Sequence, residues 1–413
     1  MDTNELILAI VLSCIIVGGV VWSQKNKGLV LIAWRQILHA PGRSAVVVAC
    51  IAISIAIPTL TNLLVNHYDQ ELSSRARSTP LLVGSKGNRI DLTLSTLYFR
   101  QAKHETIPFS EYEKIQSWRK GVAIPMNLRF RARGNPIVAT SAEYFERRNL
   151  TCIAGRLPFR LGEVVLGYAV AQEIGLVPGE ALFSDQPELY DISKPAALKM
   201  IVVGSLIESG TPDDDAVFVD IKTAWILEGI AHGHQEAEAL DPDLLVSNKD
   251  GKIQVSGAMI EYNEVTPQNE AGFHYHGDTT LLPLSSILFF PRNAKEGVIS
   301  SVRVKTTKLY QMVKPEAVVD ELMAKIFQVK SFLDLISILL AISTSFLIAL
   351  VCILTVRMRT REVQTMHEIG IGKMRVIMLL GSEVIVLIVC GCALASLIVT
   401  TGWYIFPDLI TSL

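Results

Sequence analysis

Residues 357–375 read RMRTREVQTMHEIGIGKMR, and this polar stretch separates two long apolar runs. Residues 335–356 contain no charged side chain, and residues 376–413 contain only Glu383 and Asp408. Each run is long enough to cross a bilayer, because about 20 apolar residues in a helix span the hydrocarbon core. The connector carries five Lys or Arg against two Glu, so the positive-inside rule predicts that it is cytoplasmic.

The composition indicates an integral membrane protein with a large polar insert. Half of the 413 residues are apolar, and the mean hydropathy is +0.37. Two further apolar segments, residues 6–24 and 44–65, precede the insert. We therefore predict a membrane protein with four transmembrane α-helices, two before and two after a large α+β periplasmic domain.

The predicted orientation follows from the basic residues of the two polar connections. Residues 25–43 contain four Lys or Arg and no acid, so this linker is also expected in the cytoplasm. The chain starts with an acidic segment and shows no cleavage pattern, so we expect an uncleaved first helix with its N-terminus outside. The expected order is 1–24 first transmembrane helix, 25–43 cytoplasmic linker with an interfacial helix at 28–40, 44–65 second transmembrane helix, 66–330 periplasmic α+β domain with stalk, 331–356 third transmembrane helix, 357–375 cytoplasmic coupling segment, 376–406 fourth transmembrane helix and 407–413 periplasmic C-terminus.

The insert reads as an ordinary folded domain without nucleic-acid or disulfide chemistry. Residues 66–334 have a net charge of −5, which excludes a nucleic-acid footprint, and Cys152 has no cysteine partner there. Residues 315–329 predict an amphipathic helix that runs directly into the third span as a stalk. Local patterns predict strands at 136–140, 163–166, 198–206, 216–219 and 302–305, helices at 142–148 and 168–174, and a turn at 177–180.

Several segments together resemble the MacB/FtsX-type (type VII) ABC transporter permeases. The connector resembles the family's cytoplasmic coupling segment in Arg359-Thr-Arg-Glu362 and in residues 367–372, HEIGIG. Glu383 stands where that family has an early membrane-buried acid, and residues 33–44 resemble its N-terminal signature. Residues 155–158, 163–167 and 216–219 resemble its periplasmic core segments.

One feature departs from the family pattern. The family has one span before the exterior domain and three after it, whereas this chain has two before and two after. We expect residues 6–24 to occupy the position of the missing fourth helix, as in a circular permutation.

The resemblance implies a non-catalytic permease subunit of the bacterial inner membrane that transmits motion to its periplasmic domain. The implied partners are a separate ABC ATPase, present as a dimer, and a second permease copy in a homodimer within the lipid bilayer. The sequence agrees, because it lacks the G-x-x-x-x-G-K-[ST] phosphate loop and should not bind ATP itself.

The connector's charges have two readings. They could only set the topology, but Glu362, His367 and Glu368 dilute a pure positive-inside signal, and a docking helix needs directional polar contacts. We favour docking. The candidate ATPase-coupling residues are Arg359, Arg361, Glu362, His367, Glu368, Gly370 and Gly372.

Glu383 is the candidate polar residue inside the membrane. An intramembrane carboxylate is costly and usually faces the bundle interior or a polar partner. It could equally extend toward the inner interface, and the sequence leaves both readings open.

Four of the eight histidines form two His-x-His pairs, His232 with His234 and His274 with His276. On a strand, residues i and i+2 share a face, so such pairs can converge on one metal. Zinc prefers four tetrahedral nitrogen, oxygen or sulfur ligands. A zinc site is the candidate cofactor site, and solvated loop histidines are the alternative. We interpret Asp213-Asp-Asp215 as a solvated turn that leads into a strand, not as a cation site.

The cargo stays open at this stage. The segment 273–278 resembles one in proteobacterial permeases linked to zinc limitation, which implies zinc-related transport or release and a periplasmic metal-binding or substrate protein. Alternatives are extrusion of lipoproteins, peptides or drugs, or a membrane-anchored metal sensor that regulates a periplasmic enzyme.

Overall fold

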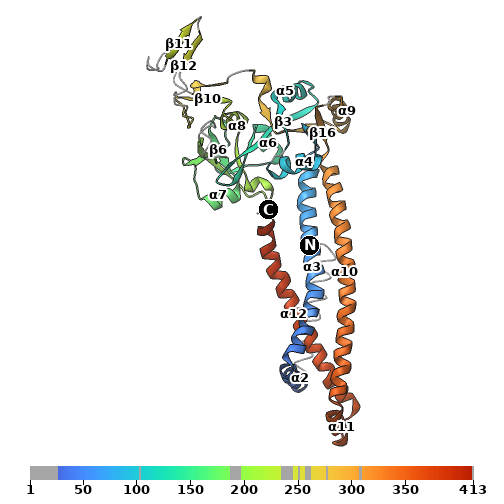
Figure 1. The fold of residues 1–413 in the computed structure, drawn as a ribbon. Helices are drawn as coiled ribbons and strands as arrows, with labels where there is room; N and C mark the ends of the chain where they lie inside the picture. The colour runs from blue at the N-terminus through green and yellow to red at the C-terminus, as the bar shows by residue number, and fades with distance from the viewer. Residues whose placement is uncertain are drawn as a thin grey trace. The chain divides into compact units, whose positions relative to one another are not determined.

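The computed structural model describes residues 27–101, 104–186, 197–233, 245–249, 252–255, 262–275, 278–306 and 309–411. The chain divides into two compact units. Residues 1–70 and 323–413 form the helical unit, and residues 71–322 form the sheet unit. Figure 1 labels helices of both units and some of the strands. The first predicted span, 6–24, and its expected place in the bundle lie outside the described residues.

Three helices of the described chain are long and apolar enough to cross a membrane. They are α3 (Pro41–Arg77), α10 (Pro315–Met358) and α12 (Lys373–Thr411), which contain the second, third and fourth predicted spans. The four-span count therefore stays a prediction. The predicted interfacial helix is α2 (Lys27–His39), and α3 begins at Pro41, since proline suits the first turn of a helix.

Small residues let the long helices of the helical unit approach closely. Ala52 and Ala56 of α3 are buried together with Ala395 of α12. The Ser54 and Thr344 hydroxyls, on α3 and α10, lie 2.8 Å apart in a hydrogen bond. Such contacts are typical of helix packing in membranes, where apolar side chains alone do not drive association.

The connector between α10 and α12 is itself helical. It forms α11 (Thr360–Glu368), a helix of nine residues. Gly370 follows with φ +88, and the amides of Gly370 and Ile371 donate to the carbonyls of His367 and Met366 at 3.0 Å. This is a Schellman ending, which requires the left-handed backbone that glycine adopts easily.

The sheet unit is built on a ten-stranded mixed sheet, so the predicted α+β class is confirmed. Its strand order is β16-β1-β15-β3-β4-β9-β6-β8-β5, with β7 paired to β8. Only the β4–β9 and β6–β8 pairs are parallel. The strands are β1 (Leu81–Ser85), β3 (Gly121–Ala132), β4 (Asn135–Thr140), β5 (Cys152–Gly155), β6 (Glu163–Leu166), β7 (Ala181–Phe183), β8 (Lys199–Leu206), β9 (Val217–Asp220), β15 (Ser286–Pro291) and β16 (Tyr310–Val313).

Helices of the sheet unit pack around this sheet, and smaller ladders lie beside it. The helices are α4 (Arg89–Tyr98), α5 (Phe109–Ser117), α6 (Ala142–Arg148), α7 (Tyr168–Ile174), α8 (Ile221–Leu227) and α9 (Ala294–Lys305). The two-stranded ladders are β2 (Ile107–Pro108) with β14 (Pro283–Leu284), β10 (Ala231–Gly233) with β13 (Phe273–Tyr275), and β11 (Leu245–Lys249) with β12 (Lys252–Val255).

Most of the local predictions match observed elements, and one is wrong. The predicted strands at 136–140, 163–166, 198–206 and 216–219 match β4, β6, β8 and β9, and the two predicted helices are α6 and α7. The predicted strand at 302–305 instead belongs to helix α9. The Asn293 side chain caps α9 by accepting a hydrogen bond from the Glu296 amide at 2.9 Å, and this cap outweighs the β-branched residues near the helix end.

We predict that Gly391→Ala weakens the packing of α3 against α12. A Cβ atom at Gly391 would lie 2.5 Å from Cγ2 of Ile51, so the helices must shift. The free energy of unfolding of the purified chain in detergent should fall by about 1–3 kcal/mol. The matched control is Gly381→Ala on the same helix, where a Cβ atom meets nothing within 4 Å. Equal stability of both variants would contradict the packing.

Candidate functional site

Glu383 of α12 is the buried acid of the helical unit, at 3% exposure. Arg43, near the start of α3, donates to Oε1 of Glu383 at 2.8 Å. Arg359, immediately before α11, has a guanidinium nitrogen 3.5 Å from Oε2, which has no hydrogen bond from the described residues. Arg43 also donates to the Thr355 hydroxyl of α10 at 3.1 Å. The Glu383 carboxylate of α12 is therefore bonded to Arg43 of α3, and Arg43 in turn contacts Thr355 of α10. All three long helices take part in this set of contacts.

Glu383 is buried within the helical unit. Its carboxylate has two arginine partners, as a buried charge requires. The partners come from the two basic segments, residues 25–43 and 357–375. Arg43 and Arg359, one from each segment, thus lie beside the same carboxylate.

A mainly apolar cavity of about 320 Å³ borders the Glu383 carboxylate. Its walls include Ile51 of α3, Cys352 of α10 and Leu387 of α12. Glu383 is therefore not enclosed by packing on every side, and the hydrogen bond from Arg43 orients its carboxylate.

The predicted coupling residues fall into two groups. Arg361, Glu362, His367 and Glu368 are exposed on α11, and Gly370 and Gly372 are exposed beyond its end. Arg359 differs, because its half-buried side chain is turned toward Glu383. The outer face of α11 is thus available to a partner, while Arg359 holds the helix to α12.

Large apolar side chains next to α11 were not among the sequence candidates. Ile369 is 74% exposed, Met358 73% and Met374 67%. A polar surface that also contains exposed apolar anchors is the usual composition of a protein interface. The sequence could have indicated Ile369 as a contact residue, because it is an apolar residue between a polar helix and Gly370.

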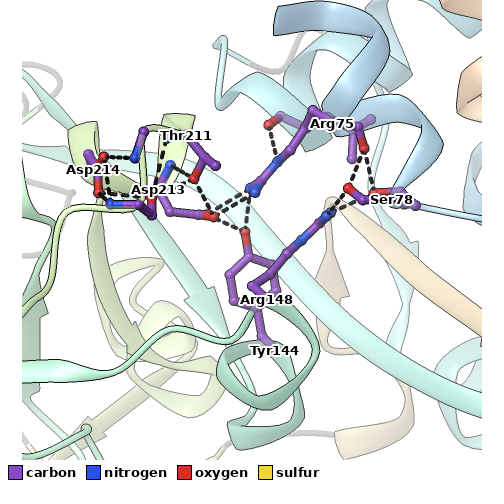
Figure 2. Close-up of polar contacts among 11 residues, drawn as sticks. Arg75, Ser78, Tyr144, Arg148, Thr211, Asp213 and Asp214 are labelled. Carbon is purple, nitrogen blue, oxygen red and sulfur yellow. Dashed lines mark hydrogen bonds and ion pairs between the residues drawn. The ribbon is translucent and has the colours of Figure 1, made fainter.

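A buried polar cluster lies in the sheet unit, where α3 contributes its last residues (Figure 2). The Arg75 guanidinium donates to both carboxylate oxygens of Asp213, at 2.5 and 2.7 Å. The Tyr144 hydroxyl of α6 donates to Asp213 at 2.6 Å and accepts from Arg75 at 2.8 Å. Arg148 of α6 donates to the Ser78 hydroxyl at 2.6 Å.

The interpretation of Asp213-Asp-Asp215 as a solvated turn is wrong for two of its three acids. The triplet forms a short 3-10 helix (Pro212–Asp215) that leads into β9, as expected, but Asp213 is only 1% exposed and Asp214 is also buried. Asp214 accepts hydrogen bonds from the amides of Ser209 and Gly210. Burial alone would raise the pKa of Asp213, but Arg75 and Tyr144 hold this pKa below its usual value. Only Asp215 is exposed.

The structure brings together one histidine from each His-x-His pair. In the antiparallel β10–β13 ladder, His232 lies directly opposite His274. Their ring centroids are 5.2 Å apart. His234 and His276 lie outside the described residues, so a four-histidine site stays a prediction. Among the residues with described positions, no group of three or more His, Cys, Asp or Glu is placed to hold a metal.

Comparison with known proteins gives partial structural likenesses, among them two domains of transporters. No protein-family model matches the chain. No curated protein matches it either. The periplasmic region of MacB from Actinobacillus actinomycetemcomitans aligns over 61% of this chain and 98% of its own, at 9% identity and a TM-score of 0.36. The extracellular domain of the noncanonic ABC-type transporter YknZ from Gram-positive bacteria aligns over 56% and 98%, at 8% identity and a TM-score of 0.32. Neither likeness establishes a family for this chain.

We predict that Asp213→Ala destabilises the sheet unit by about 3–5 kcal/mol, because it leaves the Arg75 guanidinium buried without its counter-ion. The double change Arg75→Met and Asp213→Leu should cost less than Asp213→Ala alone. Asp215→Ala is the matched control and should change the free energy of unfolding by less than about 0.5 kcal/mol. An equal loss in both single variants would contradict the buried pair.

The same pair predicts a pH dependence. The pKa of Asp213 is lower in the folded than in the unfolded protein, so its contribution to stability is complete above its ordinary pKa of about 3.9. The contribution is lost as the pH falls through the folded pKa. Unfolding free energies between about pH 3 and 7 should therefore fall less steeply toward acid in Asp213→Asn than in the wild type. Parallel curves would argue against a charged Asp213.

Proposed function

We propose that this chain is a non-catalytic permease subunit of a MacB/FtsX-like ABC complex. A separate ATPase dimer docks on α11, and its motion reaches the sheet unit through the long helices. The sheet unit lies in the periplasm, α3, α10 and α12 cross the bacterial inner membrane, and two permease copies pair with the two ATPase subunits.

The observation that carries this proposal is the exposed polar helix between two candidate spans. A simple turn would suffice to reverse the chain, yet α11 has nine residues and a Schellman ending. The side chains of its polar outer face and of Ile369 are exposed. The helix is also tied to α12 through Arg359 and Glu383, so a push on α11 acts directly on a spanning helix.

The route outward follows two continuous helices. Helix α10 has 44 residues from Pro315 to Met358, and α3 has 37 residues from Pro41 to Arg77. Both contribute their outer ends to the sheet unit. Arg75, near the end of α3, is bound inside that unit by Asp213, so displacement of α3 is passed to the strand that follows Asp213.

The first test changes the charge on α11 and at Ile369, the residue that follows it. We expect Glu362→Lys, and separately Ile369→Asp, to reduce recovery of the partner ATPase at least 10-fold when the tagged full chain is purified from its native membranes. The reason is that each change places a repulsive or desolvated charge in the contact.

The control is Lys295→Glu, a reversal of an exposed charge on α9 of the sheet unit, which should leave recovery unchanged. If no nucleotide-hydrolysing protein accompanies the wild-type chain, the permease proposal fails and a membrane-anchored sensor becomes the better hypothesis. If the ATPase accompanies all variants equally, it docks elsewhere.

The second test concerns orientation. We predict that a cysteine introduced at exposed Thr365 of α11 is protected from a membrane-impermeant maleimide in intact cells. A cysteine at exposed Glu146 of α6 should react under the same conditions, and both should react after the cells are opened. Labelling of both positions in intact cells would place the connector and the sheet unit on one side and overturn the proposal.

The cargo depends on the chemistry of the sheet unit. Lipoproteins, peptides and drugs need no metal, whereas zinc-related transport or release requires a site that binds the ion.

A further inference from the structure

The cavity beside Glu383 is a groove along the three long helices of the helical unit. It has a volume of about 320 Å³ and is lined mostly by Val, Ile and Leu side chains. Its wall on α10 runs from Ile348 to Val356, a length of about 12 Å at 1.5 Å per residue. The groove also reaches the backbone of α12 at Gly381, where an added Cβ atom would meet nothing within 4 Å.

The groove opens at the end next to the connector. Val356 and Ile377, which line this end, are exposed, whereas Ile51 and Leu387, farther along their helices, are buried. An apolar cavity holds water poorly and accepts apolar molecules instead. Between helices that cross a bilayer, the apolar molecules at such an opening are lipid acyl chains.

Two arginines with one acidic partner stand at the same end of the groove. Arg43 lies one turn before Val47 of the groove wall, and the Arg359 amide donates to the carbonyl of Thr355, also in the wall, at 3.2 Å. Of the acids in the described part of the chain, Glu383 alone pairs with the two arginines. The set therefore carries one net positive charge.

Both guanidinium groups are accessible to an anion outside the helices. The side chains of Arg43 and Arg359 are 25% and 20% exposed, while that of Glu383 is 5% exposed. The described residues give the Arg359 guanidinium an ion pair at 3.5 Å and no hydrogen bond, so its N–H groups can donate to a phosphate. Basic pockets between membrane helices are typical binding places of anionic lipid headgroups.

We propose that this groove binds an anionic phospholipid, with an acyl chain in the apolar groove and the phosphate at Arg43 and Arg359. A zwitterionic lipid with the same chains fills the groove equally well but leaves the net charge uncompensated. A free phosphate compensates the charge but leaves the groove empty. The inference rests on one part of the proposed function, the membrane-spanning course of α3, α10 and α12, and requires no ATPase.

The test is native mass spectrometry of the purified full chain in detergent, titrated with phosphatidylglycerol or with phosphatidylcholine of the same acyl chains. We expect phosphatidylglycerol to bind at least about 5-fold more tightly, which is the contribution of one basic residue near an anionic lipid. Inorganic phosphate at the same concentration should not displace it. Equal binding of the two lipids, or binding of neither, would overturn the proposal.

A change in the groove wall tests the place of the acyl chain. Gly381→Leu should weaken phosphatidylglycerol binding at least about 10-fold, because the new side chain occupies the groove. The matched control is Gly28→Leu on α2, outside the groove, where an added Cβ atom also meets nothing within 4 Å. The midpoint of thermal unfolding in detergent checks that both variants fold. Wild-type binding in Gly381→Leu would show that the chain lies elsewhere.

A change of charge tests the place of the phosphate. Arg359→Gln should bind the two lipids equally, and Arg359→Lys should keep the preference for phosphatidylglycerol. Lys295→Gln, at an exposed position of the sheet unit, is the control and should behave as the wild type does. An unchanged preference in Arg359→Gln would remove the headgroup assignment.

The remaining outcomes separate this inference from its alternatives. If a second copy of the chain covers the groove, Gly381→Leu changes the ratio of monomer to dimer and no lipid binds to the wild type, which overturns the lipid site. Loss of the ATPase from α11 variants that still bind lipid concerns the docking helix alone. Absence of bound lipid from a chain that recovers its ATPase would refute this inference and leave the permease function intact.

Discussion

The structure depends on how it compensates its buried carboxylates, above all Glu383 and Asp213. A charge removed from water is costly unless an opposite charge and hydrogen bonds accompany it. Glu383 meets this requirement with Arg43 and Arg359, and Asp213 meets it with Arg75 and Tyr144. In both places the arginine comes from a segment distant in sequence, so each pair fixes a long-range contact that apolar packing alone would leave less specific.

The two ion pairs have different surroundings, and this difference suits different tasks. Arg75 donates hydrogen bonds to both carboxylate oxygens of Asp213, and Tyr144 and Thr211 donate one each. The position of this carboxylate is therefore fully determined. Among the described residues, Glu383 has a hydrogen bond at one oxygen only, and it lines a cavity. The carboxylate of Asp213 is therefore the more fully coordinated of the two.

The sequence predicted the features that follow from local periodicity and missed those that depend on distant partners. Apolar run length gave the three candidate spans that the structure describes, and local sequence patterns gave β4, α6, β6 and α7. Asp213 looked like a solvated turn because nothing nearby indicates Arg75, which is 138 positions away. His-x-His spacing indicated a shared face within each pair, but the opposition of His232 and His274 depends on a strand pairing that no local pattern shows.

The unequal distances around Glu383 have a mechanical meaning. The nearer arginine, 2.8 Å away on α3, can keep the acid neutralised by itself, while the one attached to α11 stands back at 3.5 Å. Separation of α11 from α12 would therefore leave the buried acid with one charged partner. The electrostatic cost of that separation would be small, because Arg43 would still neutralise Glu383.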